Sequence, residues 1–183
     1  KVQIMQLSKD GQKVVGAKKT LICDCLGISG GWTPAVHLYT QSGGKLKFRE
    51  NDQVFIPNYQ SKQHISVGSC NGEMTLDEIF ENTTRSVKNF LQIENTDYEN
   101  LEILSSFNQS KRNIWLLPSD VESGKTKSFV DYQNDATAKD IKLALREGFR
   151  SIEHVKRYTT TGMGTDQGKL GNMHALGIIS ETA

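Results

Sequence analysis

The chain has 183 residues, enough for one medium-sized domain or for a small domain with part of another. Its 22 basic and 21 acidic residues leave a net charge of +1, and 36% of the residues are apolar. This balance argues against a nucleic-acid-binding stripe, and the chain has no run of about 18 apolar residues that could cross a bilayer. We therefore expect no nucleic acid and no membrane among its partners.

The first part of the chain has the pattern of β-structure with one short helix. The predicted strands cover residues 2–7, 12–16, 19–29, 45–48 and 64–70. The first two flank the turn signal SKDG and should pair as a hairpin, and the third should be mostly buried. After the third strand, Pro34 can open a short helix over 34–41 that ends before Gly43 and Gly44.

The middle of the chain changes to helical periodicity. Residues 74–92 place apolar side chains on one broad face of a predicted helix: Leu76, Ile79, Phe80, Val87, Phe90 and Leu91. Residues 92–112 are polar throughout and are predicted to form a linker or long loop. The segment NIWLLP at 113–118 should be short and extended.

The last third predicts a small helical module. Thr137 is a good N-cap with Asp140 three residues later, and this helix should bury Ile141, Ala144 and Leu145 before it stops at Gly148. Ser151 should cap a second short helix, which ends in the solvated run KRY at 156–158. Glycines at 162, 164 and 168 then space a tight loop, and a last helix should begin near Asn172.

Few side chains outside these patterns suggest chemistry. The three cysteines (Cys23, Cys25 and Cys70) have no regular spacing, which predicts free thiols in a reducing, cytoplasmic compartment. Cys23 and Cys25 would share one face of a strand, and we interpret them as paired small strand residues. The four histidines (His37, His64, His154 and His174) are scattered and predicted to be surface or packing residues. Trp32 could form an aromatic platform, but we favour a buried position at the edge of the sheet.

The stretch ISVGSCNG at 65–72 suggests a nucleotide-binding turn. A strand, two glycines four residues apart and a helix let the backbone approach a phosphate, although an ordinary strand-to-helix turn has the same pattern. The stretch resembles the last nucleotide-contacting turn of the pyridine-nucleotide–disulfide oxidoreductase family, with Ser69 where that family has Asp. The resemblance implies that FAD is not bound in the usual way, because that Asp holds a flavin sugar hydroxyl. The opening Gly-x-Gly-x-x-Gly loop of that family is absent, so half of the nucleotide site would lie outside this chain.

The stretch from Val130 to Gly171 resembles the [2Fe–2S] module of the bacterioferritin-associated-ferredoxin family. The two helices and the glycine loop GMGTDQGK carry this resemblance. The family's four cysteine ligand positions hold Asp131, Gln133, Asp166 and Gly171. Iron–sulfur clusters need thiolates, so we expect no cluster and no metal here. A replacement hard-metal site at Asp131 and Asp166 is a minor alternative.

Both motifs occur in this order in the alpha-subunit family of heterotetrameric sarcosine oxidases, which the chain resembles. The segments GGWTPAVHL, VDYQNDATAKDI and NMHALGI carry the resemblance, which is weak over 81–119. The resemblance implies oxidative demethylation of sarcosine to glycine, with 5,10-methylenetetrahydrofolate and hydrogen peroxide as further products. It implies NAD in the alpha subunit, FAD and FMN associated with the beta subunit, and tetrahydrofolate in a later domain. The beta, gamma and delta subunits would be the partners.

On this basis no catalytic residue is expected in the chain. The resemblance places Ser69, Met74 and Leu76 at positions that touch NAD, and Gly68 and Gly72 are added as steric requirements. The alternatives are a non-catalytic docking module of another flavin-dependent amine dehydrogenase complex, and an opine- or cyanide-forming dehydrogenase subunit, against which the missing cysteines argue.

The predicted fold class is α/β with a mixed sheet, part of a dinucleotide-binding fold, followed by a small all-α ferredoxin-like module without cysteines. We interpret the chain, which begins at Lys1, as a piece of a longer protein. The predicted boundaries are 1–92 for the end of the NAD domain, 93–127 for a linker, 128–171 for the helical module and 172–183 for the start of a folate-binding aminomethyltransferase-like domain.

Overall fold

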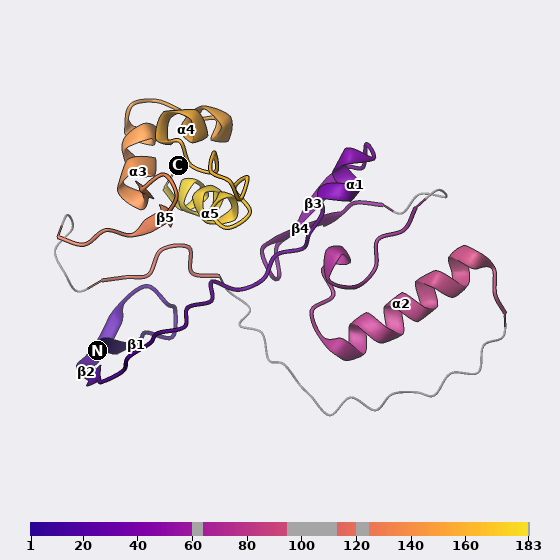
Figure 1. Ribbon diagram of the computed structural model, residues 1–183, viewed down its shortest axis with the longest axis horizontal. Helices are drawn as coiled ribbons and strands as arrows, with labels where there is room; N and C mark the ends of the chain where they lie inside the picture. Colours follow the sequence, from indigo (N-terminus) through magenta and orange to yellow (C-terminus); the bar gives the residue numbers. More distant parts are fainter. Residues whose placement is uncertain (60–63, 95–112, 120–124, 183) are drawn as a thin grey trace. The chain divides into compact units, whose positions relative to one another are not determined.

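The computed structural model describes residues 1–59, 64–94, 113–119 and 125–182. The chain falls into two compact units, one formed by Lys1–Leu26 with Ile114–Ala183 and the other by Gly27–Asn113. Figure 1 shows the elements of each unit in the colours of the sequence.

The first unit begins with a β-hairpin. Strand β1 (Val2–Leu7) pairs antiparallel with β2 (Val14–Leu21), in a register that places Leu7 opposite Val14. The Ser8 N–H closes the turn by donating to the Lys13 carbonyl at 2.9 Å. The predicted hairpin is confirmed, and its second strand is longer than expected.

The third strand predicted over 19–29 is wrong. Strand β2 ends at Leu21, and residues 22–36 form no regular element. Cys25 is exposed, so the C-x-C pair does not lie on a buried strand. Trp32 is 79% exposed and is not the buried edge residue that we expected. The physical reason is that no described strand pairs with residues 22–29, and a strand needs a neighbour to satisfy its backbone.

The second unit holds a short helix, a hairpin and a long helix. Its elements are α1 (His37–Gln41), β3 (Leu46–Arg49), β4 (Val54–Pro57), the 3₁₀ turn η1 (Gly68–Asn71) and α2 (Leu76–Leu91). Strands β3 and β4 pair antiparallel, with Arg49 opposite Val54. Strand β4 was not predicted. The strand predicted over 64–70 is wrong, because Gly68 has φ +67 and begins a 3₁₀ turn.

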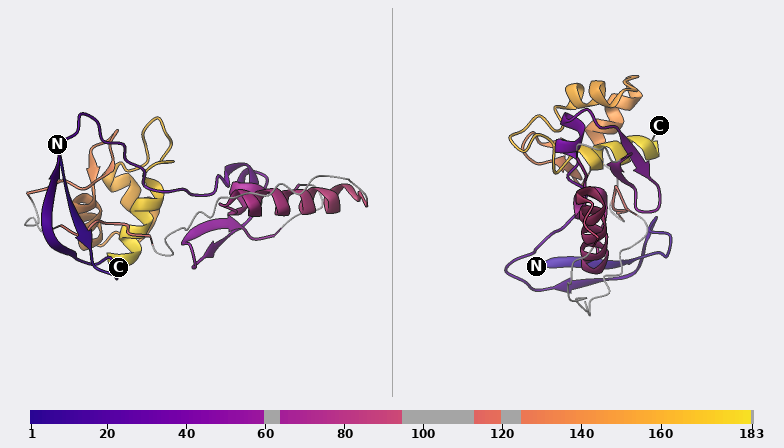
Figure 2. Two further views of the ribbon diagram at one scale, coloured as in Figure 1. Left: turned by 90° about the horizontal axis from the view of Figure 1, so that it is seen from below. Right: turned by 90° about the vertical axis from the view of Figure 1, so that its right-hand side faces the viewer.

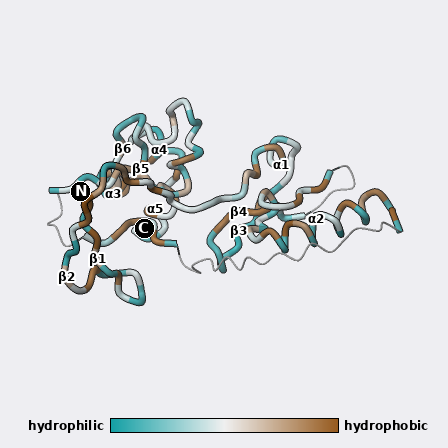
Figure 3. The backbone as a smooth tube through the Cα atoms, turned by 60° about the horizontal axis from the view of Figure 1, so that its bottom comes forward, coloured by the Kyte–Doolittle hydropathy of each residue, from teal (hydrophilic) through white to brown (hydrophobic). Residues whose placement is uncertain are grey.

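Helix α2 confirms the helix predicted over 74–92, but its apolar face is not a buried one. Among the residues that the structure describes, no residue of α2 is buried, and Phe80, Phe90 and Leu91 are exposed. Apolar and polar residues alternate along it with helical spacing (Figure 3). The predicted broad apolar face is therefore not covered within the described residues.

The helical module follows in the first unit. Its elements are β5 (Phe129–Asp131), β6 (Ala136–Thr137), α3 (Ala138–Arg146), α4 (Ile152–Thr159) and α5 (Asn172–Thr182). The predicted capping box is confirmed, because the Asp140 N–H donates to the Thr137 hydroxyl and the Thr137 N–H donates to the Asp140 carboxylate at 2.8 Å. Ser151 occupies the N-cap of α4 without a side-chain cap hydrogen bond. Strands β5 and β6 form a small antiparallel pair that was not predicted.

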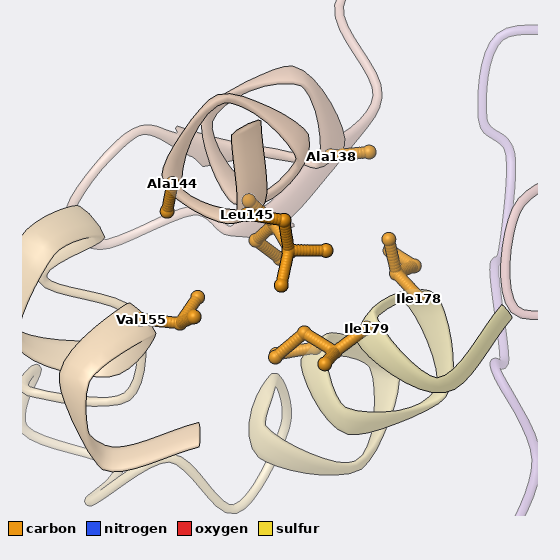
Figure 4. Packing of buried hydrophobic residues seen from close by; sticks show 8 residues of the cluster. Ala138, Ala144, Leu145, Val155, Ile178 and Ile179 are labelled. Carbon is orange, nitrogen blue, oxygen red and sulfur yellow. The ribbon is translucent and has the colours of Figure 1, made fainter. Parts of the chain in front are cut away.

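One hydrophobic core joins the three helices, which lie together in Figure 2. Ile141, Ala144 and Leu145 of α3 are buried as predicted, and they meet Val155 of α4 (Figure 4). Helix α5 contributes Ala175, Ile178 and Ile179 to the same cluster. Residues 172–182, which we expected to open a following domain, therefore pack in the core of this module.

The observed class is mixed α and β, with the described strands paired in three two-stranded antiparallel sheets. The dinucleotide-binding fold and the ferredoxin-like class of the module remain predictions. Within the described ranges, no helix has the length and apolarity needed to cross a bilayer.

Candidate functional site

The predicted nucleotide-binding turn comprises η1 and the residues up to the start of α2. Gly68 and Gly72 have φ +67 and +84, a left-handed conformation that other residues rarely adopt. Ser69 is exposed at the surface of this turn, and Leu76 is the first residue of α2. The structure thus brings the five predicted contact residues (Gly68, Ser69, Gly72, Met74 and Leu76) into one turn, but whether they bind NAD stays a prediction.

Arg49 at the end of β3 holds this turn from the side. Its guanidinium donates to the Gly72 carbonyl at 2.5 Å and forms a forked ion pair with Asp52, in which Nε lies 2.8 Å from Oδ1. The hydrogen bond with Asp52 raises the pKa of Arg49, and Glu73 and Glu78 add to this effect. A Cβ at Gly72 would lie 2.7 Å from both the Arg49 guanidinium and Ile56, so the turn has no room for a side chain there.

Glu73 closes the turn from the other side. Its carboxylate accepts the Gly68 N–H at 2.9 Å and the Asn71 side-chain amide at 3.2 Å. Asp77 and Glu78 stand in the first turn of α2. The glycine shape of the turn fits the close approach of a dinucleotide, but its acidic lining fits an uncharged part of NAD and does not fit the pyrophosphate.

The second candidate site is the glycine loop of the helical module. Asp131, at the end of β5, is only 7% exposed, and its carboxylate accepts four hydrogen bonds. One oxygen accepts the N–H groups of Gln133 at 2.8 Å and Asn134 at 3.2 Å. The other accepts the Gly162 N–H at 2.7 Å and the Asn134 side-chain amide at 3.2 Å. Asp131 therefore ties the β5–β6 turn to the loop after α4.

The other three positions of the predicted lost ligand set have their own contacts in this turn and loop. The Gln133 side-chain oxygen accepts the N–H and hydroxyl of Thr165 at 2.7 and 2.6 Å. The Asp166 carboxylate accepts the N–H groups of Gly168 at 3.2 Å and Leu170 at 3.1 Å. A Cβ at Gly171 would lie 2.8 Å from the Val130 carbonyl and 3.8 Å from the Asp131 Cβ.

This donor set does not fit an iron–sulfur cluster, which needs thiolates. The oxygens of Asp131, Gln133 and Asp166 already accept hydrogen bonds from the chain, and Gly171 has no side chain. Among the residues that the structure describes, no group of three His, Cys, Asp or Glu side chains could hold a metal ion. The glycines of the loop leave room for the side chain of Asn172, because Cβ atoms at Gly162 and Gly168 would overlap its amide.

We expect the stability of the helical module to fall in acid. Burial raises the pKa of the Asp131 carboxyl, but hydrogen bonds from Gly162, Asn134 and Gln133 outweigh it and hold the pKa below its usual range. The stabilisation is therefore fully present above the unfolded-state pKa of about 3.9 and is lost as the pH falls through the lower folded-state pKa. Urea midpoints measured at several pH values below about 5 should show a smaller slope for Asp131→Asn than for the unaltered chain. Equal slopes would contradict this assignment.

Sequence reasoning missed three residues that shape these sites. Arg49 and Glu73 were not singled out, although a carboxylate next to Gly72 at the start of a helix was a usable signal. Asn172 was noted only as a helix start. The histidine prediction is confirmed, because His64 packs edge-on against Tyr39, His174 packs edge-on against Trp115, and His37 and His154 are exposed.

The family model of the sarcosine oxidase A3 domain matches residues 125–183. This range contains β5, β6 and all three helices of the module, so the match to the sarcosine oxidase A3 domain model covers the whole helical module. The match begins close to the predicted boundary at 128 and extends through α5.

The whole chain is similar to alpha subunits of sarcosine oxidase. It is 33% identical over 170 residues to sarcosine oxidase subunit alpha of Rhizobium meliloti (strain 1021), an alignment that covers 91% of this chain and 17% of that protein. It is 30% identical over 185 residues to sarcosine oxidase subunit alpha of Corynebacterium sp. (strain U-96), covering 97% of this chain and 19% of that protein. The predicted resemblance is confirmed, and the chain spans less than a fifth of the length of these relatives.

Proposed function

We propose that this chain acts as a segment of the alpha subunit of a heterotetrameric sarcosine oxidase, in the cytoplasm, and contributes NAD binding and subunit assembly. The observation that carries the proposal is the similarity to sarcosine oxidase alpha subunits over nearly the whole chain, together with the A3 domain match. The complex would oxidatively demethylate sarcosine to glycine, forming 5,10-methylenetetrahydrofolate and hydrogen peroxide. This similarity favours sarcosine oxidase over a docking module of another flavin-dependent amine dehydrogenase complex.

In this proposal the oxidation takes place elsewhere in the complex. FAD and FMN would be associated with the beta subunit and tetrahydrofolate with a later domain of the alpha subunit, and the gamma and delta subunits would complete the assembly. The turn formed by η1 and the start of α2 would contact NAD through Ser69, Met74 and Leu76, with Gly68 and Gly72 giving it shape. The helical module would work without an iron–sulfur cluster, because the side-chain oxygens of Asp131, Gln133 and Asp166 close the glycine loop.

Ser69→Asp in the intact alpha subunit is expected to weaken NAD binding by about tenfold. Ser69 is exposed, so the variant leaves the packing unchanged. It removes the serine hydroxyl as a donor to the ligand and adds a negative charge close to a ligand whose pyrophosphate is also negative. The measurement is an NAD titration followed by calorimetry. Asn89→Asp is the matched control, because it adds the same charge about 20 Å farther along α2 and should leave the affinity unchanged. Equal NAD affinities for the two variants would refute the role of this turn.

A further inference from the structure

In the turn at 68–76, the backbone N–H group of Gly68, which could bind a phosphate, is already hydrogen-bonded to a side chain of the protein. Gly68 is buried, and its N–H donates to the Glu73 carboxylate at 2.9 Å. The other oxygen of Glu73 accepts the Asn71 side-chain amide at 3.2 Å. In phosphate-binding turns, such N–H groups point at the ligand's oxygens. Here a carboxylate of the protein occupies the place of the anion.

The charges around the turn reinforce this arrangement. Asp77 and Glu78 stand in the first turn of α2, where they already complement the positive end of the helix dipole. The nearby cation, Arg49, is engaged by Asp52 and by the Gly72 carbonyl. A pyrophosphate placed at the start of α2 would therefore meet carboxylates and would find Arg49 already paired.

The Glu73 carboxylate can still accept further hydrogen bonds. Each carboxylate oxygen has about two acceptor sites, and each oxygen of Glu73 receives one of the hydrogen bonds given above. The residue is half-buried, so a ligand group can reach it. The neutral donors of NAD are its ribose hydroxyls, its adenine amino group and its nicotinamide amide. Of these, the ribose hydroxyls are the groups that carboxylates bind in dinucleotide-binding folds.

We propose that Glu73 is a specificity-determining residue, which makes the turn at 68–76 a site for ribose hydroxyls of NAD and excludes its pyrophosphate. The inference rests on the proposed function, because it concerns the same turn. Beyond the proposed function, the inference says which part of NAD binds at the turn. It also gives a role to Glu73, which had none.

The direction of the change in affinity on Glu73→Gln tests this assignment. The glutamine carbonyl can still accept the Gly68 N–H, so the turn keeps this hydrogen bond while the charge and the acceptor for the Asn71 amide are removed. We expect NAD binding by the intact alpha subunit to weaken about tenfold, because a hydroxyl bonds more strongly to a charged acceptor than to a neutral one. Glu78→Gln, which removes an equal charge in the first turn of α2, should change the affinity less than about twofold.

The other outcomes overturn the inference. Tighter NAD binding by Glu73→Gln would mean that the pyrophosphate lies at the turn and was repelled by the carboxylate. Unchanged binding would mean that Glu73 only closes the turn. If Ser69→Asp weakens NAD binding and Glu73→Gln does not, the proposed function stands and only this inference fails. If the unaltered subunit binds no NAD, both fail together.

Discussion

Asp131→Asn is expected to destabilise the helical module by about 3 kcal/mol, more than any other polar substitution proposed for this chain. The carboxylate accepts two hydrogen bonds on each oxygen, from Gln133 and Asn134 on one side and from Gly162 and Asn134 on the other. In either orientation, the asparagine would turn its NH₂ group toward two donors. Two buried or partly buried donors would then lose their acceptor, either within the β5–β6 turn or in the link between β5 and the loop after α4.

The measurement is urea unfolding followed by the fluorescence of Trp115, which packs against the core of the module. The chain has two tryptophans, so Trp32→Phe gives a background with one reporter, and the exposed Trp32 is safe to replace. Asp135→Asn is the matched control, because it makes the same chemical change at an exposed position in the same turn. It should shift the stability by less than about 0.5 kcal/mol. Equal midpoints for the two variants would show that Asp131 does not hold the loop.

Gly177→Ala is expected to destabilise the same module by about 2 kcal/mol, although alanine normally favours a helix over glycine. Gly177 lies within α5, and a Cβ there would overlap the indole ring of Trp115. The indole therefore packs directly on the helix backbone. The added methyl group must push Trp115 away or move the helix out of the core that it shares with α3.

The effect should change sign when Trp115 is removed. In a Trp115→Ala background, Gly177→Ala should stabilise α5 by up to about 1 kcal/mol, since only the helix propensity remains. Amide hydrogen exchange of α3 and α5 measures both free energies without a tryptophan reporter. A destabilisation of similar size in both backgrounds would place the steric conflict somewhere other than the indole.

The helices were the most predictable part of this fold, because their signals are local. The capping box of Thr137 and Asp140 and the buried stripe of α3 depend on residues three and four apart. The strands depended on partners that the sequence pattern does not reveal. The apolar segment 19–29 has strand composition, but only residues through Leu21 find a neighbour in β1. Residues 92–112 were predicted as a linker, and all but the first three lie outside the described residues.

The candidate sites show the same limit at the level of side chains. The glycine spacing indicated both loops, and the resemblance to ferredoxin-like modules indicated which positions hold other residues where that family has cysteines. Neither showed that Asp131 would accept four hydrogen bonds, or that Glu73 would reach back to Gly68. These contacts depend on the side-chain positions that the complete fold sets, and a spacing pattern contains no such information.

The hydrogen bonds that close the glycine loop of the helical module also affect how this part of the protein matures and how it resists oxidation in the cell. A thiolate-bound cluster must be delivered after synthesis, and its ligands are open to oxidation. The oxygens of Asp131, Gln133 and Asp166 are supplied with the polypeptide, so the proposed cluster-free module would need no iron delivery to fold. They also cannot be oxidised as sulfur is, which suits a complex proposed to release hydrogen peroxide during every turnover.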